Sequence, residues 1–463
     1  MKENYYFIGI GGIGMSALAR YFNMLGAQVY GYDRTPSDLT RELESEGMKI
    51  HYTDLVSAIP FEIKSAVDKT IVVITPAIPQ ENNEYTYFRE NGFSILKRAK
   101  VLGLICRNMK TIAIAGTHGK TSTTTFTSYL MKNSKNGCNA FLGGISKNFN
   151  SNYVFDENSN FVVVEADEYD RSFHNLYPST AIITAMDADH LDIYGTHQAV
   201  IESFYKFACQ IKKGGSLIHK LGLDFAPILP QLQQNGVRIY TYSLQDSAAD
   251  FYMKSIEIKN NAFELCLHTP FGEIKSIYFA LPGKTNVENY VAAAAAALVN
   301  GVTRDELYKA TNTLQGVIRR FDVQVASPKL VYIDDYAHHP AELKACIESI
   351  REMYAGKKLT GIFQPHLYTR TRDFASEFAE SLSLLDELIL LDIYPAREEP
   401  IPGVTSQLIF DQVTCPEKQM CSKENVLEVL KNKELEVLIT VGAGNIDRLV
   451  QPITELLNKR VNG

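Results

Sequence analysis

The sequence predicts an α/β protein that is divided into three consecutive domains. Short apolar runs alternate with stretches of helical pattern along most of the 463 residues. Two of these runs lead into glycine-rich turns that open a helix, and the runs in the last third of the chain end in polar residues. At roughly 150 residues per domain, the length accommodates about three domains.

Composition and charge exclude several classes of protein. With 45% hydrophobic and 21% charged residues, the chain has the composition of a globular protein. Its formal net charge of −7 argues against nucleic-acid and anionic-membrane partners, because both require a basic surface. No stretch approaches the ~20 apolar residues of a membrane span. We therefore expect no nucleic acid and no membrane span.

The seven cysteines indicate a reducing compartment. They are scattered and form no Cys-x-x-Cys pair, which favours reduced thiols over a disulfide framework or a zinc site. Residues 1–6 lead directly into an apolar run without the pattern of a secretory signal. We expect a cytoplasmic location, and the sequence leaves open whether the protein is a monomer or a dimer.

The first glycine turn, residues 9–14, predicts a site for a pyrophosphate with a sugar. It follows a strand at 5–8 and opens a helix, and a second strand at 28–32 ends at Asp33. This Gly-x-Gly-x-x-Gly pattern allows a tight turn and close approach to a pyrophosphate, while the acid suits a ribose hydroxyl. A nucleotide-sugar such as a UDP-sugar fits as well as NAD. A third strand at 70–74 ends at a loop on the same edge of the sheet.

The second glycine turn predicts a phosphate loop. A strand at 111–115 leads to Gly116-x-x-Gly119-Lys120-Thr121, and a helix follows. In such a turn, backbone amides and the helix N-terminus face an anion, the lysine adds a positive charge and the threonine hydroxyl ligates Mg²⁺. The general P-loop spacing requires a glycine at position 114, which is isoleucine, so the loop is shortened.

Two acidic clusters downstream predict a Mg²⁺–triphosphate site. A strand at 161–164 ends in four carboxylates within residues 165–170, and a strand at 180–184 leads to Asp189-His190-x-Asp192. Hard cations take carboxylate oxygens. Residues 235–280 read as short strands of a small β flap, and an Ala-rich helix follows with Asn286 and Asn289 on one face of its first turn. Helix capping explains one asparagine and leaves the second without a role.

The last third of the chain repeats the α/β pattern. Strands are expected at 330–333, 359–363, 387–391 and 437–441, and each ends in polar or charged residues. A doubly wound sheet places its binding site at that edge.

Taken in order, the motifs resemble those of the Mur ligase family over nearly the whole chain. They are Gly9-Ile-Gly-Gly-Ile-Gly-Met-Ser16, Gly116-Thr-His-Gly-Lys-Thr121, Glu165-Ala-Asp-Glu-x-Asp170, Asp189-His190-x-Asp192, Asn286-x-x-Asn289, Arg319-Arg-Phe-Asp322, Asp334-Asp-Tyr-Ala-His-His-Pro340, Gln364-Pro-His366 with Thr369-Arg-Thr-Arg-Asp373, and Gly442-Ala-Gly-Asn-Ile446. The resemblance implies a Rossmann-like domain at 1–107, a central P-loop-type ATPase α/β domain with the β flap at 108–317, and a Rossmann-like domain at 318–463.

The resemblance also implies an activity: ATP-dependent joining of L-alanine to the lactyl carboxylate of UDP-N-acetylmuramate through an acyl phosphate. This is the first amino-acid addition to the peptidoglycan precursor. ATP and one or two Mg²⁺ ions, with Mn²⁺ as an alternative, are the implied cofactors. A peptide-recycling relative that joins a tripeptide to the same UDP-sugar is the first alternative. An NAD-dependent oxidoreductase is the second, and it leaves the phosphate loop without a role.

Site residues carried over from the family fall into five groups. The implied catalytic residues are Lys120, His190 and Asp335. Those for ATP are Gly116, Thr117, His118, Gly119, Lys120, Thr121, Ser122, Asn286, Asn289, Arg320, Asp335, Tyr336 and His339. Those for the UDP-sugar are Gly11, Gly12, Ile13, Gly14, Met15, Ser16, Asp33, Arg34, Thr75, Ala77 and Ile78. Those for the amino acid are His366, Arg370 and Arg372, and those for metal are Thr121, Glu165 and His190.

Two positions depart from the family pattern. Many relatives have a basic residue after Gln-Pro-His, where this chain has Leu367. The acidic motif often has serine where this chain has Tyr169, a variant that also resembles the peptide-recycling relative.

Overall fold

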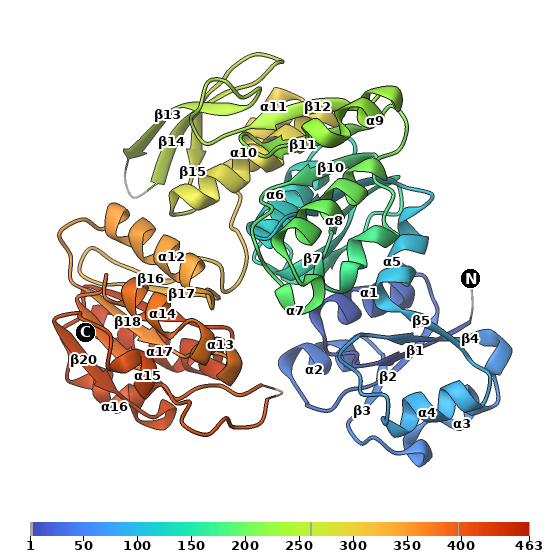
Figure 1. Ribbon diagram of the computed structural model, residues 1–463, viewed down its shortest axis with the longest axis horizontal. Helices are drawn as coiled ribbons and strands as arrows, with labels where there is room; N and C mark the ends of the chain where they lie inside the picture. Colours follow the sequence, from blue (N-terminus) through green and yellow to red (C-terminus); the bar gives the residue numbers. More distant parts are fainter. Residues whose placement is uncertain (1–2, 260–261, 397, 463) are drawn as a thin grey trace. The chain divides into compact units, whose positions relative to one another are not determined.

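The computed structural model describes residues 3–259, 262–396 and 398–462, and the chain divides into two compact units. The first unit comprises Met1–Glu257, Glu264–Phe279 and Glu288–Gln315, and the second comprises Ile258–Phe263, Ala280–Val287 and Gly316–Gly463. Both are α/β, with helices packed on parallel sheets, as Figure 1 shows. The predicted fold class is confirmed, and the predicted domain boundaries at 107/108 and 317/318 stay predictions.

The first sheet, at the start of the first unit, has five parallel strands in the order β3-β2-β1-β4-β5. The strands are β1 (Asn4–Ile8), β2 (Gln28–Tyr32), β3 (Lys49–His51), β4 (Thr70–Ile74) and β5 (Ser94–Lys97). The helices are α1 (Ile13–Met24), α2 (Asp38–Ser45), α3 (Phe61–Lys64), α4 (Asn83–Glu90) and α5 (Arg98–Cys106). Alternate residues of β1 face opposite layers, because Phe7 belongs to the α1 core and Tyr6 to the Phe88 core.

The second sheet of the first unit has seven strands in the order β12-β11-β10-β6-β9-β7-β8. The strands are β6 (Lys110–Ala115), β7 (Asn139–Ser146), β8 (Ser151–Val154), β9 (Phe161–Glu165), β10 (Thr180–Ile183), β11 (Ser216–Lys220) and β12 (Arg238–Tyr242). The helices are α6 (Lys120–Lys132), α7 (Leu191–Tyr194), α8 (His197–Cys209), α9 (Leu229–Gln234), α10 (Lys284–Val299) and α11 (Arg304–Thr311). Only the β7–β8 hairpin is antiparallel among the described pairings of this sheet. In this order β6, the strand that leads into the phosphate loop, lies at the centre of the sheet, between β10 and β9.

A separate three-stranded sheet has the order β13-β14-β15. Its strands are β13 (Tyr252–Lys259), β14 (Ala262–His268) and β15 (Ile274–Phe279). The predicted flap also included residues 237–243, and that part of the prediction is wrong. Strand β12 pairs in parallel with β11 at the end of the main sheet, because α9 connects the two as a crossover helix. Strand β12 is the outermost strand of the sheet, and its residues are mostly half-buried.

The sheet of the second unit has six strands in the order β16-β17-β21-β18-β19-β20. The strands are β16 (Asp322–Ala326), β17 (Val331–Asp335), β18 (Leu359–Phe363), β19 (Glu387–Leu390), β20 (Glu417–Met420) and β21 (Val437–Val441). The helices are α12 (Pro340–Met353), α13 (Tyr368–Asp373), α14 (Ala375–Leu382), α15 (Gln407–Phe410), α16 (Val426–Lys431) and α17 (Val450–Asn462). Apolar cores cover both faces, and β16 alone runs antiparallel among the described pairs of this sheet.

The sequence predicted no membrane-spanning segment and reduced cysteines, and the structure bears on both points. Within the described residues, no helix combines the length and apolar character needed to cross a membrane. All seven cysteines are free thiols.

Candidate functional site

The first glycine turn lies at the carboxyl edge of the five-stranded sheet, between β1 and α1. Asp33, at the end of β2, accepts a hydrogen bond from the Gly11 amide through Oδ2 at 2.8 Å. No side chain caps α1 at Gly12, so its first turn presents backbone amides and the positive end of the helix dipole. Asp33 thus holds the turn, and the turn leaves the helix N-terminus open for an anion.

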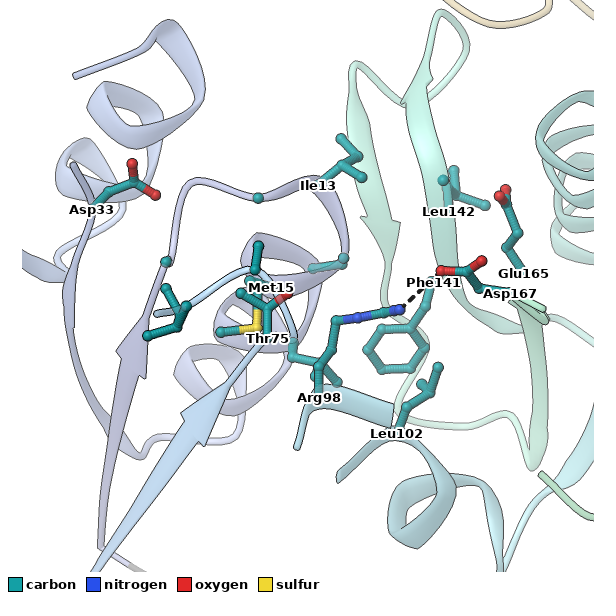
Figure 2. Close-up of a pocket in the computed structure, with 18 residues that line it drawn as sticks. Ile13, Met15, Asp33, Thr75, Arg98, Leu102, Phe141, Leu142, Glu165 and Asp167 are labelled. Atoms are coloured by element: carbon teal, nitrogen blue, oxygen red, sulfur yellow. Dashed lines mark hydrogen bonds and ion pairs between the residues drawn. The ribbon is translucent and has the colours of Figure 1, made fainter. Parts of the chain in front are cut away.

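A pocket of about 430 Å³ lies beside this turn, and Figure 2 shows its lining residues. Eight predicted UDP-sugar residues line it: Gly12, Ile13, Gly14, Met15, Asp33, Thr75, Ala77 and Ile78. The opposite wall comes from the seven-stranded sheet, through Phe141, Leu142 and Gly143 of β7 and Glu165 and Asp167 at the end of β9. The pocket therefore belongs to both sheets of the first unit.

Three predicted UDP-sugar residues, Gly11, Ser16 and Arg34, are not among the lining residues. Ser16 is fully buried, and its hydroxyl donates to the carbonyl oxygens of Gly12 and Ile13 at 3.0 Å each. The amide of Asn152, in β8, donates to Ser16 Oγ at 2.8 Å and to Ile13 O at 2.6 Å. Ser16 thus links the first turn of α1 to the β7–β8 hairpin.

The phosphate loop, residues 116–121, connects the central strand β6 to α6. Gly119 has a φ of +78° at the N-cap of α6, a conformation that side chains rarely adopt, and no side chain caps this helix. Thr184, after β10, braces the loop by donating to the carbonyl oxygen of His118. Thr117, Thr121 and Ser122 are nearly buried. The sequence-predicted residues of the loop therefore form one turn at a helix N-terminus, largely withdrawn from solvent.

Lys120 is held inside the loop in a buried ion pair. Its ammonium donates to Glu168 Oε1 and to Gly116 O, each at 2.7 Å. Burial lowers the pKa of Lys120, but the charges of Glu168 and Glu165 outweigh burial and leave the pKa raised, so the ammonium stays protonated. Burial also raises the pKa of the Glu168 carboxyl, and the Lys120 charge offsets part of that rise.

Three side chains near the phosphate loop form a candidate metal site. Ligand atoms of Glu168, Asp189 and His190 all lie within 4.8 Å of one another. His190 has a φ of +51°, and its backbone amide donates to Asp189 Oδ1 at 2.7 Å. The ring of Tyr169 meets the His190 ring edge-on, with centroids 5.2 Å apart. The departure at position 169 therefore packs against the predicted metal ligand.

Two asparagines of α10 belong to different compact units. Asn289 lies in the first unit, where Thr123 donates to its Oδ1 at 3.4 Å beside the phosphate loop. Asn286 is the third residue of α10 and donates to Pro282 O at 2.7 Å, so it is not the N-cap. Asn289 therefore adjoins the predicted ATP residues of its own unit.

Within the second unit, Asp335 is the last residue of β17 and lies beside Phe321. Its carboxylate accepts backbone hydrogen bonds from Phe321 at 2.6 Å and from Ala337 at 2.8 Å. Burial raises its pKa, and the Arg320 charge offsets part of that rise. The guanidinium groups of Arg319 and Arg320 lie 5.0 and 5.1 Å from the Tyr336 ring centroid. Arg320, Asp335 and Tyr336 thus form one cluster. His339, three residues after Tyr336, contacts a different side chain: its ring meets the Phe374 ring edge-on.

The predicted amino-acid residues follow β18 in the second unit. Arg370 Nη1 lies 3.3 Å from His366 Nδ1, and the His366 ring stacks on Tyr394 at 5.9 Å. Arg372 instead pairs with the adjacent Asp373 at 2.7 Å and is half exposed. Leu367 has a φ of +72° and is the N-cap of α13. The structure therefore brings His366 and Arg370 together and places Arg372 in a separate ion pair.

Comparison with known proteins covers all three parts of the chain. Residues 4–110 match the profile of the Mur ligase family catalytic domain, residues 114–297 the Mur ligase middle domain, and residues 319–444 the Mur ligase glutamate ligase domain. A protein of Parabacteroides distasonis named UDP-N-acetylmuramate–L-alanine ligase is 54% identical over 98% of this chain and 97% of that protein. The chain belongs to the Mur ligase family.

Solved structures of Mur ligases share the fold. A UDP-N-acetylmuramate–alanine ligase from Thermotoga maritima has a TM-score of 0.80 at 25% identity, covering 99% of both chains. A murein peptide ligase from Psychrobacter arcticus has a TM-score of 0.70 at 21% identity, covering 98% of both chains. The second likeness concerns the fold alone.

Four residues of this Mur ligase were not singled out from the sequence. Glu168 and Asp189 stood inside recognised acidic clusters, but the pattern did not indicate which carboxylate meets Lys120 or His190. Arg98 lines the pocket and Asn152 holds α1. Arg98 begins the helix after β5, at the carboxyl edge of the first sheet, and that position was the available signal. Asn152 gave no signal, since its partners are 136 and 139 residues away.

The donor set of the Mur ligase fits a divalent cation. Glu168 is almost fully buried, yet its Oε2 has no hydrogen-bond partner among the described residues. A buried, unpartnered carboxylate oxygen beside a second carboxylate and an imidazole offers oxygen and nitrogen ligands to Mg²⁺ or Mn²⁺.

Proposed function

We propose that the protein is an ATP-dependent ligase that joins L-alanine to the lactyl carboxylate of UDP-N-acetylmuramate. One observation carries the proposal: the pocket and the phosphate loop meet at a single acidic loop, residues 165–171. Glu165 and Asp167 of this loop line the pocket, while Glu168 binds Lys120. A carboxylate substrate in the pocket would therefore adjoin the phosphates of a nucleotide on the loop.

The proposed chemistry follows from the weak reactivity of a carboxylate. Transfer of the γ-phosphoryl group of ATP to the lactyl carboxylate gives an acyl phosphate and ADP. The neutral amine of L-alanine then attacks the acyl carbon, the amide bond forms, and phosphate leaves. Lys120 and the loop amides would neutralise charge on the transferring phosphoryl group.

The remaining predicted residues are proposed for the parts of the substrates. The glycine turn, Asp33 and residues 75–78 would bind the UDP-sugar. Arg320, Asp335, Tyr336, His339, Asn286 and Asn289 are proposed to contact ATP. Supporting this, Asn289 adjoins Thr123 behind the phosphate loop, and Arg320 stacks on Tyr336.

Divalent cations are proposed to be held by Thr121, Glu165 and His190, as the family resemblance implies, together with Glu168 and Asp189. The support is the close grouping of Glu168, Asp189 and His190. A bound Mg²⁺ would supply positive charge that offsets the negative charge of the triphosphate. Lys120 would then leave Glu168 for the nucleotide, and the Glu168 carboxylate would turn to the ion.

The amino acid is proposed to bind through His366 and Arg370. A guanidinium suits the alanine carboxylate, and Arg370 lies beside His366, whereas Arg372 is paired with Asp373. The ammonium of alanine must lose a proton before attack. Three groups fit as the base: His190, His366 and Asp335, whose pKa is raised by burial.

Addition of alanine is favoured over addition of a tripeptide by the names of similar proteins. The 54% identical relative is named as the L-alanine ligase, whereas the likeness to a murein peptide ligase, at 21% identity, extends to the fold alone. We further propose a cytoplasmic location, which the seven free thiols support. Monomer and dimer both remain compatible with the proposal.

Phosphate release tests the proposal directly. The full-length protein is incubated with Mg²⁺, ATP and UDP-N-acetylmuramate, and release is measured against a panel of amino acids and an L-Ala-γ-D-Glu-diamino-acid tripeptide. We expect L-alanine to stimulate release and to appear in a UDP-linked product by mass spectrometry. Equal stimulation by the tripeptide, or none by L-alanine, would contradict the proposal.

A further inference from the structure

The pocket contains a cation that no predicted motif included. Arg98 is the first residue of α5, and its guanidinium extends across the pocket between α1 and the acidic loop, as Figure 2 shows. Its Nη2 donates to Asp167 Oδ2 at 3.3 Å. The Arg98 side chain is 20% exposed and that of Asp167 is 36% exposed. This pair is therefore only partly withdrawn from the pocket space.

The guanidinium of Arg98 lies against the backbone of Gly14, in the first turn of α1. An added Cβ on Gly14 would stand 2.8 Å from Arg98 Nη1 and 3.3 Å from Cζ. The third glycine of the turn thus makes room for this guanidinium beside the open helix N-terminus. The positive end of a helix and a guanidinium at the same place both attract an oxyanion.

The charge of the pocket makes Arg98 distinctive. Among the described lining residues, Arg98 alone is basic, whereas Asp33, Glu165 and Asp167 are acidic. A UDP-sugar with a lactyl carboxylate carries a diphosphate and a carboxylate, both anionic. An anionic ligand needs a positive charge among these three carboxylates, and Arg98 is the one basic side chain among the described lining residues.

We propose that Arg98 is a specificity-determining residue that binds an oxyanion of the UDP-sugar, exchanging Asp167 for a phosphate or carboxylate oxygen pair. This inference rests on the proposed function and deepens it. A guanidinium binds either oxyanion in a bidentate manner, which a lysine does not reproduce. Release of Asp167 would free a carboxylate of the same acidic loop whose Glu168 binds Lys120.

The neighbouring residue offers a matched control. Lys97 pairs with Asp170, also in the acidic loop, at 3.0 Å, but neither residue lines the pocket. Lys97→Met therefore removes one positive charge and one ion pair at the start of the same helix without changing the pocket. Any effect of Arg98→Met that exceeds this control belongs to the pocket.

The test is equilibrium binding to the full-length protein by titration calorimetry. The ligands are UDP, UDP-N-acetylglucosamine, which lacks the lactyl carboxylate, and UDP-N-acetylmuramate. We expect Arg98→Met to weaken UDP-N-acetylmuramate about 10- to 100-fold, as loss of a charge-assisted hydrogen bond does. Arg98→Lys should retain part of the affinity, and Lys97→Met should bind as the wild type does. Weakening of all three ligands identifies the diphosphate as the partner, and weakening of UDP-N-acetylmuramate alone identifies the carboxylate.

Asp167→Asn separates ligand recognition from a merely structural pair. If Arg98 binds the ligand, removing its competitor leaves affinity equal to or higher than that of the wild type. If the pair only supports the fold, Asp167→Asn and Arg98→Met weaken binding together, and the inference is overturned. Unchanged binding by Arg98→Met also overturns it, with ATP binding reporting that the variant is folded. A wild type that binds none of the three ligands overturns the proposed function itself.

Discussion

At the scale of single residues, the Lys120–Glu168 pair dominates the phosphate loop. Glu168 is almost fully buried, and Lys120 donates to it at 2.7 Å. Breaking such a pair by removing one partner leaves an uncompensated buried charge and typically costs about 3–5 kcal/mol of stability. The pair therefore links two properties, since the cation proposed to neutralise ATP phosphates also stabilises the fold.

We expect Lys120→Met to abolish ATP-dependent phosphate release and to lower the thermal midpoint. The double variant Lys120→Met/Glu168→Gln should recover much of the midpoint, because the buried charge is gone, but not the turnover. Lys132→Met is the control: it breaks the ion pair with Asp156 at the other end of α6, and it should lower the midpoint while turnover persists. Phosphate release and thermal melts measure both properties. Full turnover by Lys120→Met would refute the role of the loop.

At the scale of elements, the β7–β8 hairpin positions the first turn of α1. Asn152 is fully buried and donates to Ile13 O and Ser16 Oγ, while its Oδ1 accepts from Arg20 Nη1 at 2.6 Å. Arg20 in turn pairs with Glu42 and Glu46 near α2. The hairpin also lines the pocket through β7. One element therefore shapes the pocket wall and holds the opposite helix.

We expect Asn152→Asp to weaken UDP-N-acetylmuramate binding and to leave ATP binding unchanged. A carboxylate oxygen in place of the amide would face Ile13 O without a donor, and losing a buried hydrogen bond costs about 1–3 kcal/mol. Asn139→Asp is the matched control, because Asn139 is a buried asparagine of the same hairpin that bonds Asp156 and Ser159 rather than α1. Binding titrations compare the two. Equal loss of UDP-sugar affinity in both variants would count against a positioning role.

The elements also separate what the sequence can predict from what it cannot. Strands β2, β4, β18 and β21 begin and end at the predicted residues, because each is a short, mostly apolar and largely buried run inside a parallel sheet. Strand β13 was missed, since its pattern is mixed and largely exposed. The phosphate loop and the acidic loop could be located in the sequence, because the residues of each motif lie within a few positions of one another. Choosing Glu168 as the partner of Lys120 requires tertiary contacts 48 residues apart, which spacing does not encode.

At the scale of the whole molecule, each compact unit contains a buried carboxyl with a raised pKa. In the first unit, burial raises the pKa of Glu84 to about 8, although Tyr6 donates to it at 2.7 Å and His51 lies 3.2 Å away. In the second unit, burial raises the pKa of Asp334 to about 7. The Arg319 charge and the hydrogen bond from Thr440 both lower this pKa, but burial has the larger effect. Both folded units therefore retain protons that an unfolded chain releases near pH 4.

Stability should consequently fall as pH rises. Between the unfolded pKa values, near 4, and the folded values, about 7 and 8, the native state binds more protons than the unfolded state, so the free energy of unfolding decreases with pH. The stabilising contribution is complete below pH ~4 and is lost as pH passes the folded values. Glu84→Gln and Asp334→Asn remove one titration each and should flatten the dependence of the unfolding free energy on pH.

Because the two carboxyls lie in different units and share no partner among the described contacts, we expect the flattening to be additive in the double variant. Denaturant unfolding between pH 5 and 9 measures the slope, and Glu81→Gln, at an exposed position of the first unit, is the control substitution. A slope in Glu84→Gln equal to that of the wild type would show that this carboxyl ionises alike in both states.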